Sequence, residues 1–202
     1  AIAAQPRYAD LRCRLGSLLI ASGSVEDGLR ELLVALEINP NYVEARLQAG
    51  LAYLRLGRPG DAVAQLRVAA ANQPGYPDVQ LFLGLALLRE GSLAEATAAL
   101  EATLKSVPAF HRARYALGLI HLAAGRLDHA LREFRQAVDG DPLLLRARVD
   151  LGFLQVKRGE PEVAATLFRQ VLARDPEDAE ARLGLGLALA ACSLLVPAPA
   201  SA

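Results

Sequence analysis

Residues 43–76 read VEARLQAGLAYLRLGRPGDAVAQLRVAAANQPGY, and this stretch contains the pattern that decides the fold. From residue 43 to residue 56, apolar residues recur at helical spacing on more than one face, and Gly57 follows where helices commonly end. Pro59 falls in the first turn of a second helix, where its missing N–H is not needed. The apolar stripe of that second helix consists of Ala62, Leu66 and Ala69, and Pro74 ends it. The stretch therefore predicts two helices joined by a tight turn.

The same pattern returns at a constant interval along the chain. The prolines of this series are Pro6, Pro40, Pro74, Pro108, Pro142 and Pro176. Two glycine series keep the same step: Gly16, Gly50, Gly84, Gly118, Gly152 and Gly186, and then Gly23, Gly57, Gly91, Gly125 and Gly159. Because eleven of the 16 glycines and six of the 11 prolines fall on one lattice, the chain is predicted to be a tandem array.

The lattice also divides the chain. With the proline at position 32 of each unit, the complete repeats are 9–42, 43–76, 77–110, 111–144 and 145–178. Residues 1–8 occupy positions 27–34, the end of a truncated preceding repeat, so we expect more array or another domain upstream in the parent protein. Residues 179–202 are predicted to be a terminal capping helix and a Pro/Ala tail, because Pro197 and Pro199 cannot both lie inside a second helix.

The residues at fixed positions of the repeat resemble those of the tetratricopeptide repeat (TPR), in its bacterial-type arrays. Positions 7 and 8 are Leu15-Gly16, Ala49-Gly50, Leu83-Gly84, Leu117-Gly118 and Leu151-Gly152. Position 20 is Gly28, Ala62, Ala96, Ala130 and Ala164, and position 24 is Leu32, Leu66, Leu100, Phe134 and Phe168. Small residues at positions 8 and 20 let two helices approach closely, while positions 7 and 24 fill the seam. The resemblance implies an all-α fold, a right-handed α-solenoid of tandem helix–turn–helix repeats.

Composition excludes several classes of protein. The 202 residues include 22 basic and 22 acidic side chains, and this zero net charge argues against nucleic-acid binding. The longest nearly uncharged stretch, residues 183–196, is too short to span a membrane as a helix. Two cysteines cannot form a disulfide framework, and they are compatible with the cytoplasm, slightly favoured, the periplasm or the cell exterior. The abundance of Ala, Leu, Arg and Gly suggests a GC-rich bacterial source.

No catalytic constellation is present in the sequence. His121 lies at position 11, normally a packing position, and neither it nor His111 or His129 is paired with cysteine at metal-ligand spacing. Gly184-Leu185-Gly186 lacks the strand that a phosphate-binding loop requires. We therefore expect no enzyme activity, no cofactor and no metal.

Position 4 departs from the family, which often has a bulky apolar residue there. It is Arg12, Arg46, Arg114, Arg148 and Arg182, with Gln80 in the third repeat. The favoured interpretation is that the Arg stem covers apolar surface while its head reaches water or a neighbouring carboxylate. The alternative, a row of phosphate-binding arginines, fits the balanced charge less well.

The resemblance implies that first helices line a concave surface with positions 2, 5, 6, 9, 12 and 13, which lie on one helical face. The partner-binding candidates are Leu47, Leu51, Leu54, Arg55, Leu81, Phe82, Leu85, Leu88, Arg89, Tyr115, Leu119, Leu122, Val149, Phe153, Val156 and Lys157. They predict an apolar groove. Adjacent first helices could cover part of it, and some of these residues would then belong to the packed core and not to a binding surface. Unlike TPR domains that clamp a carboxylate, the chain has no Lys or Asn set at positions 5, 6 and 9.

Charges along the predicted groove change sign. Position 2 is Asp10, Glu44 and Asp78, and then Arg112 and Arg146. A partner with one apolar face and polarised charge would fit this arrangement, such as an amphipathic helix or an extended peptide. The leading functional interpretation is therefore a non-catalytic protein-interaction scaffold.

The terminal helix suggests a second interpretation. It is apolar nearly all round, where a capping helix usually presents polar residues to water. The candidates for self-association are Leu183, Leu187, Leu194 and Leu195. They predict assembly of a homo-oligomer or filament as one alternative. A binding arm of a larger enzyme or of a chaperone cofactor is the other.

Overall fold

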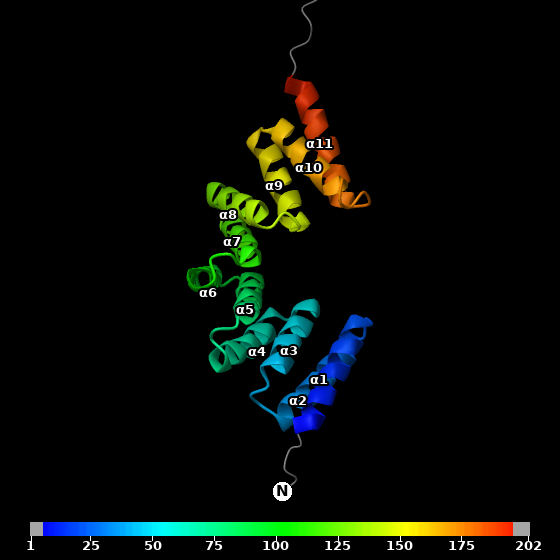
Figure 1. Cartoon of the computed structure of the whole chain (residues 1–202), viewed down its shortest axis with the longest axis vertical. Helices are drawn as coiled ribbons and strands as arrows, with labels where there is room; N and C mark the ends of the chain where they lie inside the picture. The colour runs from blue at the N-terminus through cyan, green and yellow to red at the C-terminus, as the bar shows by residue number, and fades with distance from the viewer. Residues whose placement is uncertain (1–5, 196–202) are drawn as a thin grey trace, which may run out of the picture. The chain divides into compact units, whose positions relative to one another are not determined.

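The computed structural model describes residues 6–195, and these residues form α-helices connected by short turns, with no strand (Figure 1). The helices are α1 (Pro6–Ala21), α2 (Val25–Ile38), α3 (Val43–Arg55), α4 (Pro59–Asn72), α5 (Pro77–Glu90), α6 (Leu93–Ser106), α7 (His111–Ala123), α8 (Leu127–Gly140), α9 (Leu145–Arg158), α10 (Pro161–Leu172) and α11 (Ala179–Leu195). From α3 onward every first helix begins at position 1 of its repeat, and every second helix from α2 onward begins at position 17. The predicted all-α repeat fold is confirmed.

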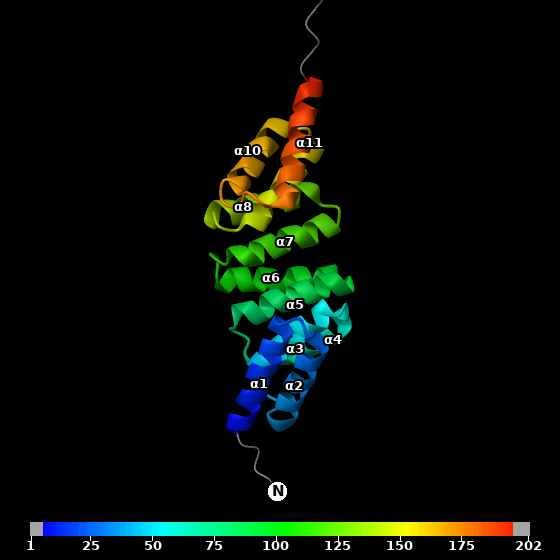
Figure 2. The ribbon, with the colours of Figure 1, turned by 90° about the vertical axis from the view of Figure 1, so that its right-hand side faces the viewer.

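The chain divides into two compact units, Ala1–Ala116 and Leu117–Ala202. In the first unit α1 packs on α2, α3 on α4, and α5 on α6, while α2 also contacts α3 and α4 contacts α5. In the second unit α9 packs on α10 and α10 on α11, and α8 contacts α9. Figure 2 shows two of these pairs side by side, α1 with α2 and α10 with α11. In these contacts a first helix lies against its own second helix, and a second helix lies against the next first helix.

Glycine at position 15 turns the chain from a first helix into the second. Gly91 has φ +96° and Gly159 has φ +82°, a left-handed conformation that lets the backbone reverse direction at little cost. A proline at the start of α4 and another at the start of α10 then occupy the first turn of the second helix, as the sequence predicts. Turn chemistry thus fixes where each pair of helices folds back on itself.

The core lies in the seam between the paired helices. A Cβ atom on Gly118 would overlap the Phe134 ring, and one on Gly152 would lie 2.7 Å from Phe168 Cζ. The position-24 side chains of the five repeats are fully buried: Leu32, Leu66, Leu100, Phe134 and Phe168. Glycine at position 8 is therefore required by the close approach of a bulky side chain, which confirms its predicted role.

The described part of the chain has neither a membrane-spanning helix nor a metal cluster. None of its helices is both long and apolar enough to cross a bilayer. No group of three or more His, Cys, Asp and Glu side chains in it is placed to hold a metal ion. His121 is buried, as expected for a packing residue at position 11.

Candidate functional site

The candidate groove residues at position 5 are core residues in most repeats of the structure. Leu47 on α3, Leu81 on α5 and Val149 on α9 are buried, and Val149 belongs to the same core cluster as Phe168. Tyr115 on α7 is only half-buried. Helical spacing predicted that these residues share one helical face, but it did not indicate how deeply that face is covered.

Positions 9 and 12 retain accessible surface. On α3 and α5, which contact each other, Leu51, Leu54, Leu85 and Leu88 are half-buried, and so is Phe82 at position 6. We call these five residues the α3–α5 apolar face. It lies entirely in the first unit.

The corresponding residues of the second unit are also half-buried, but part of their surface is engaged in packing. They are Leu119 and Leu122 on α7, and Phe153 and Val156 on α9. Phe153 and Val156 pack against the core cluster, and the rings of Phe153 and Phe168 lie edge to face, with centroids 5.1 Å apart. Phe153 and Val156 therefore contribute to packing and also keep some accessible surface on α9.

The position-13 cations border the apolar residues and are exposed. Arg55, Arg89 and Lys157 all lie at the C-terminal ends of first helices. Arg55 Nη1 donates a hydrogen bond to Ile20 O at 3.2 Å, and Arg89 lines a small cavity of about 170 Å³ together with Leu54. The α3–α5 apolar face thus has two guanidinium groups along one side.

Some position-2 charges, at the N-terminal ends of the first helices, form ion pairs between successive repeats. Arg112 Nη1 lies 3.1 Å from Asp78 Oδ1, and the Arg112 guanidinium also stacks over the Phe82 ring, 5.8 Å from its centroid. Sequence reasoning identified the change of sign along this row. It did not identify that Asp78 and Arg112, at the same position of successive repeats, neutralise one another.

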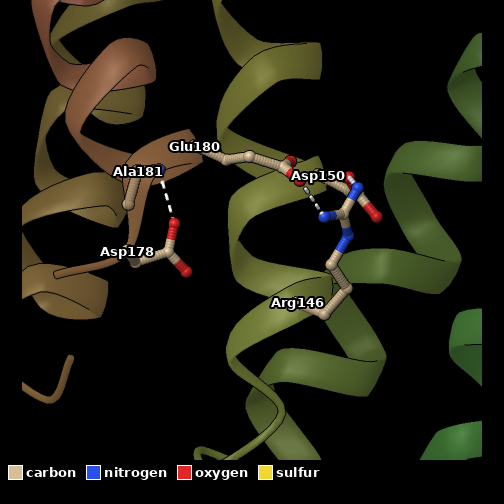
Figure 3. Close-up of polar contacts among 5 residues, drawn as sticks. All are labelled: Arg146, Asp150, Asp178, Glu180 and Ala181. Carbon is tan, nitrogen blue, oxygen red and sulfur yellow. Dashed lines mark hydrogen bonds and ion pairs between the residues drawn. The ribbon is translucent and has the colours of Figure 1, made fainter. Parts of the chain in front are cut away.

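A second such pair connects α9 to the terminal helix. Arg146 Nη1 lies 2.5 Å from Glu180 Oε1, and its Nη2 lies 3.4 Å from Asp150 Oδ1 (Figure 3). In the same region Asp178 Oδ1 accepts a hydrogen bond of 2.8 Å from the Ala181 N–H and so caps the first turn of α11 (Figure 3). The Arg146–Glu180 pair links the start of α11 to α9.

The position-4 arginines of the first two repeats extend to partners on their own second helices. Arg12 Nη1 lies 2.5 Å from Glu31 Oε2, and Arg46 Nη1 donates to Gln65 Oε1 at 2.7 Å. The expectation that the Arg head reaches a neighbouring carboxylate is confirmed for Arg12. The partner lies at position 23, and this pairing of positions 4 and 23 is a signal that sequence reasoning missed.

The exposed leucines of the terminal helix lie where the sequence predicts. Leu183 is 61% exposed, Leu194 is 85% exposed, and Leu187 is also exposed. The side chain of Leu195 is outside the described residues. A Cβ atom on Gly186 would meet no neighbouring atom within 4 Å in the described part of the chain, in contrast to Gly152 beneath Phe168. None of the described residues thus covers the face of α11 that would receive a second helix.

The repeat architecture and its glycine-lined seams define an α-helical repeat protein. A family model described as tetratricopeptide repeat matches residues 47–100, 83–143 and 149–192. The chain therefore belongs to the tetratricopeptide repeat family.

Solved structures resemble the chain over most of its length. TTC0263, a TPR protein of Thermus thermophilus, is 23% identical with a TM-score of 0.77, covering 90% of this chain and 99% of that one. MamA from Desulfovibrio magneticus RS-1 is 28% identical with a TM-score of 0.68, covering 85% and 98%. YrrB, described as a TPR protein with an unusual peptide-binding site, is 21% identical with a TM-score of 0.60, covering 90% of each chain. No curated protein sequence matches the chain significantly.

Proposed function

We propose that the chain is a non-catalytic scaffold that binds an amphipathic helix or an extended apolar peptide on the α3–α5 apolar face. The observation that carries this proposal is a contrast within the same two helices. Positions 3, 7 and 10 are buried by packing, whereas Leu51, Leu54 and Leu85 keep accessible surface. Apolar side chains that share one surface across adjacent helices are the usual receptor for the apolar face of a peptide.

Charge near this face favours a partner with acidic flanks. Arg55 and Arg89 are exposed beside it, whereas the nearest position-2 pair, Asp78 with Arg112, is internally neutralised. An incoming peptide with Asp or Glu next to its apolar residues would therefore gain attraction from the position-13 guanidinium groups. The peptide-binding description of YrrB, a protein of the same fold, supports a peptide as the class of partner.

Selection of displayed peptides on the purified chain tests the proposal. We expect the selected peptides to combine an amphipathic apolar pattern with acidic residues. Leu85→Glu is expected to weaken their binding at least about tenfold, because it places a charge at the centre of an apolar contact. The matched control is Val68→Glu, which introduces the same charge at an exposed position of α4 and should leave binding unchanged. Peptides that bind the Leu85→Glu chain as tightly as the original would contradict the proposal.

A second candidate function is self-assembly through the terminal helices. It is favoured by Leu183, Leu187 and Leu194 on α11 and by the open space above Gly186. The first unit has a similar exposed row on α1, made of Leu11, Leu15 and Leu18. Sedimentation velocity at increasing concentration tests it: we expect association that Leu183→Lys with Leu187→Lys abolishes. A chain that stays monomeric at every concentration would argue against this function.

A further inference from the structure

The pairing of the position-4 arginine with an acceptor at position 23 is missing in the fifth repeat. In the first and second repeats the guanidinium has an oxygen acceptor at position 23, supplied by Glu31 for Arg12 and by Gln65 for Arg46. In the fifth repeat position 23 is Leu167, whose side chain can accept no hydrogen bond. Arg148 therefore lacks the partner that these counterparts have.

Arg148 remains buried despite this loss. It is 9% exposed, and its Nη1 donates to Pro142 O at 3.0 Å, but its Nε is buried with no hydrogen-bond partner among the described residues. Gln155 occupies position 11 of the same helix, where the second repeat has Tyr53 and the third has Leu87. Gln155 is 3% exposed, and its Oε1 is likewise buried without a partner in the described part of the chain. Two buried, unpaired polar groups on one helix are costly, because each has lost its hydrogen bonds to water.

Arg148 and Gln155 line the same cavity. It has a volume of about 440 Å³ and lies between α8, α9 and α10, within the range of small-ligand sites. Its apolar walls are Val138, Leu151, Val163 and Leu167, and Arg135, Asp139 and Gln170 are among the polar residues that complete the lining. With two guanidinium groups and one carboxylate, the lining carries one net positive charge.

We propose that this cavity binds a carboxylate carried on an aliphatic stem. One carboxylate oxygen accepts the Arg148 Nε–H, and so replaces the acceptor that position 23 supplies in the first repeat. Gln155 lines the same cavity two helical turns further along α9. The stem lies against Val163 and Leu167. Charge-assisted hydrogen bonds of this kind are about twice as strong as those between neutral groups.

This inference is independent of the α3–α5 apolar face. The cavity is in the other compact unit, and it is lined mainly by second helices rather than by the peptide-binding positions of first helices. Two sources could supply the ligand chemistry: a free aliphatic acid, or a glutamate side chain. They differ in what is attached beyond the carboxylate and stem, so separate probes distinguish them.

Chemical-shift titration of the isotope-labelled chain tests the proposal. The probes are hexanoate and N-acetylglutamate amide at constant ionic strength, with uncharged hexanamide as the control. We expect the tighter of the two carboxylates to bind at least about tenfold more tightly than hexanamide, with shifts in the amides of α9 and α10. Tighter binding of hexanoate would identify a free acid as the ligand, and tighter binding of N-acetylglutamate amide would identify a glutamate side chain.

Leu167→Glu provides the decisive variant. It places a carboxylate at position 23, as Glu31 does for Arg12, and this carboxylate would occupy the proposed binding site. We expect this variant to raise Tm. We also expect it to weaken binding of the tighter-binding carboxylate probe at least about tenfold. Val68→Glu introduces the same charge at an exposed site of the first unit, and it should change neither Tm nor binding of the carboxylate probe. If Leu167→Glu does not fold, Arg148→Leu replaces it, because it removes the donor of the proposed contact. Equal binding of hexanoate and hexanamide, or unchanged binding to a folded variant, would overturn the proposal.

Discussion

The second and fifth repeats have the same pair of helices and the same arginine at position 4. The hydrogen-bond partners of that arginine differ between the two repeats. In the second repeat Arg46 donates to Gln65 and to Pro40 O, and buried Tyr53 fills position 11. In the fifth repeat Leu167 replaces the acceptor, Gln155 replaces the ring, and both line a cavity. The comparison separates residues that define the repeat from residues that are free to vary.

The defining residues are those of the seam. Gly50 packs under Leu66 in the second repeat just as Gly152 packs under Phe168 in the fifth. The variable residues lie at position 11 of the first helix and at position 23 of the second. Paired substitutions at these positions, and at one exposed ion pair, test the comparison from the largest expected effect to the smallest.

Phe168→Ala should have the largest effect. Phe168 is fully buried, and it packs against Gly152 on α9 and against Gly184 on α11, so its loss would leave a cavity between three helices. We expect a loss of about 3–5 kcal/mol in the free energy of unfolding, measured by urea denaturation. Leu66→Ala, its counterpart in the second repeat, should cost about 2–5 kcal/mol. A loss below about 1 kcal/mol at either site would mean that position 24 does not define the repeat.

Gly152→Ala should have the next largest effect. The new methyl group would lie 2.7 Å from Phe168 Cζ, and we expect a cost of about 1–3 kcal/mol from overpacking. Gly186→Ala is the matched control, because its methyl group would have open space around it. There the better helix propensity of Ala should raise stability by about 0.5–1 kcal/mol. Thermal melts of both variants check that Gly152→Ala lowers Tm and that Gly186→Ala raises it. A change of Tm in the same direction for both variants would contradict this account.

Gln65→Leu converts the second repeat into a copy of the fifth at position 23. Arg46 would lose the acceptor of its Nη1, and we expect a cost of about 1 kcal/mol, since its Nε would still donate to Pro40 O. The reverse exchange, Leu167→Gln, should raise stability by a similar amount. Urea denaturation of the two variants measures both changes. If both exchanges lower stability, the two repeats differ by more than the missing acceptor.

Glu180→Gln should have the smallest effect. It removes the exposed ion pair between Arg146 and Glu180, and we expect a cost of at most about 0.5 kcal/mol. The cost should vanish in 1 M NaCl, where the Debye length is about 3 Å. In the second repeat Glu44 accepts a hydrogen bond from Gln48 on its own helix, so Glu44→Gln should show a smaller salt dependence, from the helix dipole alone. The free energy of unfolding of each variant, measured at two salt concentrations, compares the two substitutions.

The sequence was sufficient to predict the fold, because Gly and Pro recur at positions where close packing and chain reversal leave few alternatives. Burial was harder to predict. Leu47 and Leu51 lie on one helical face, yet the first is core and the second is half-buried, because depth depends on neighbouring helices that periodicity does not describe. The cavity at Arg148 could be found only from packing, although Leu167, aligned with Glu31 and Gln65, already indicated a missing partner.

The open space above Gly186 has a consequence for protein engineering. Each earlier position-8 glycine is a socket for a large side chain on the following helix, and among the described residues no side chain fills the same socket on α11. A helix with the sequence pattern of α10, joined to α11 by a short glycine turn, would place its phenylalanine directly over Gly186. If that turn replaced the end of α11 from Ser193 onward, the array could therefore be lengthened one module at a time.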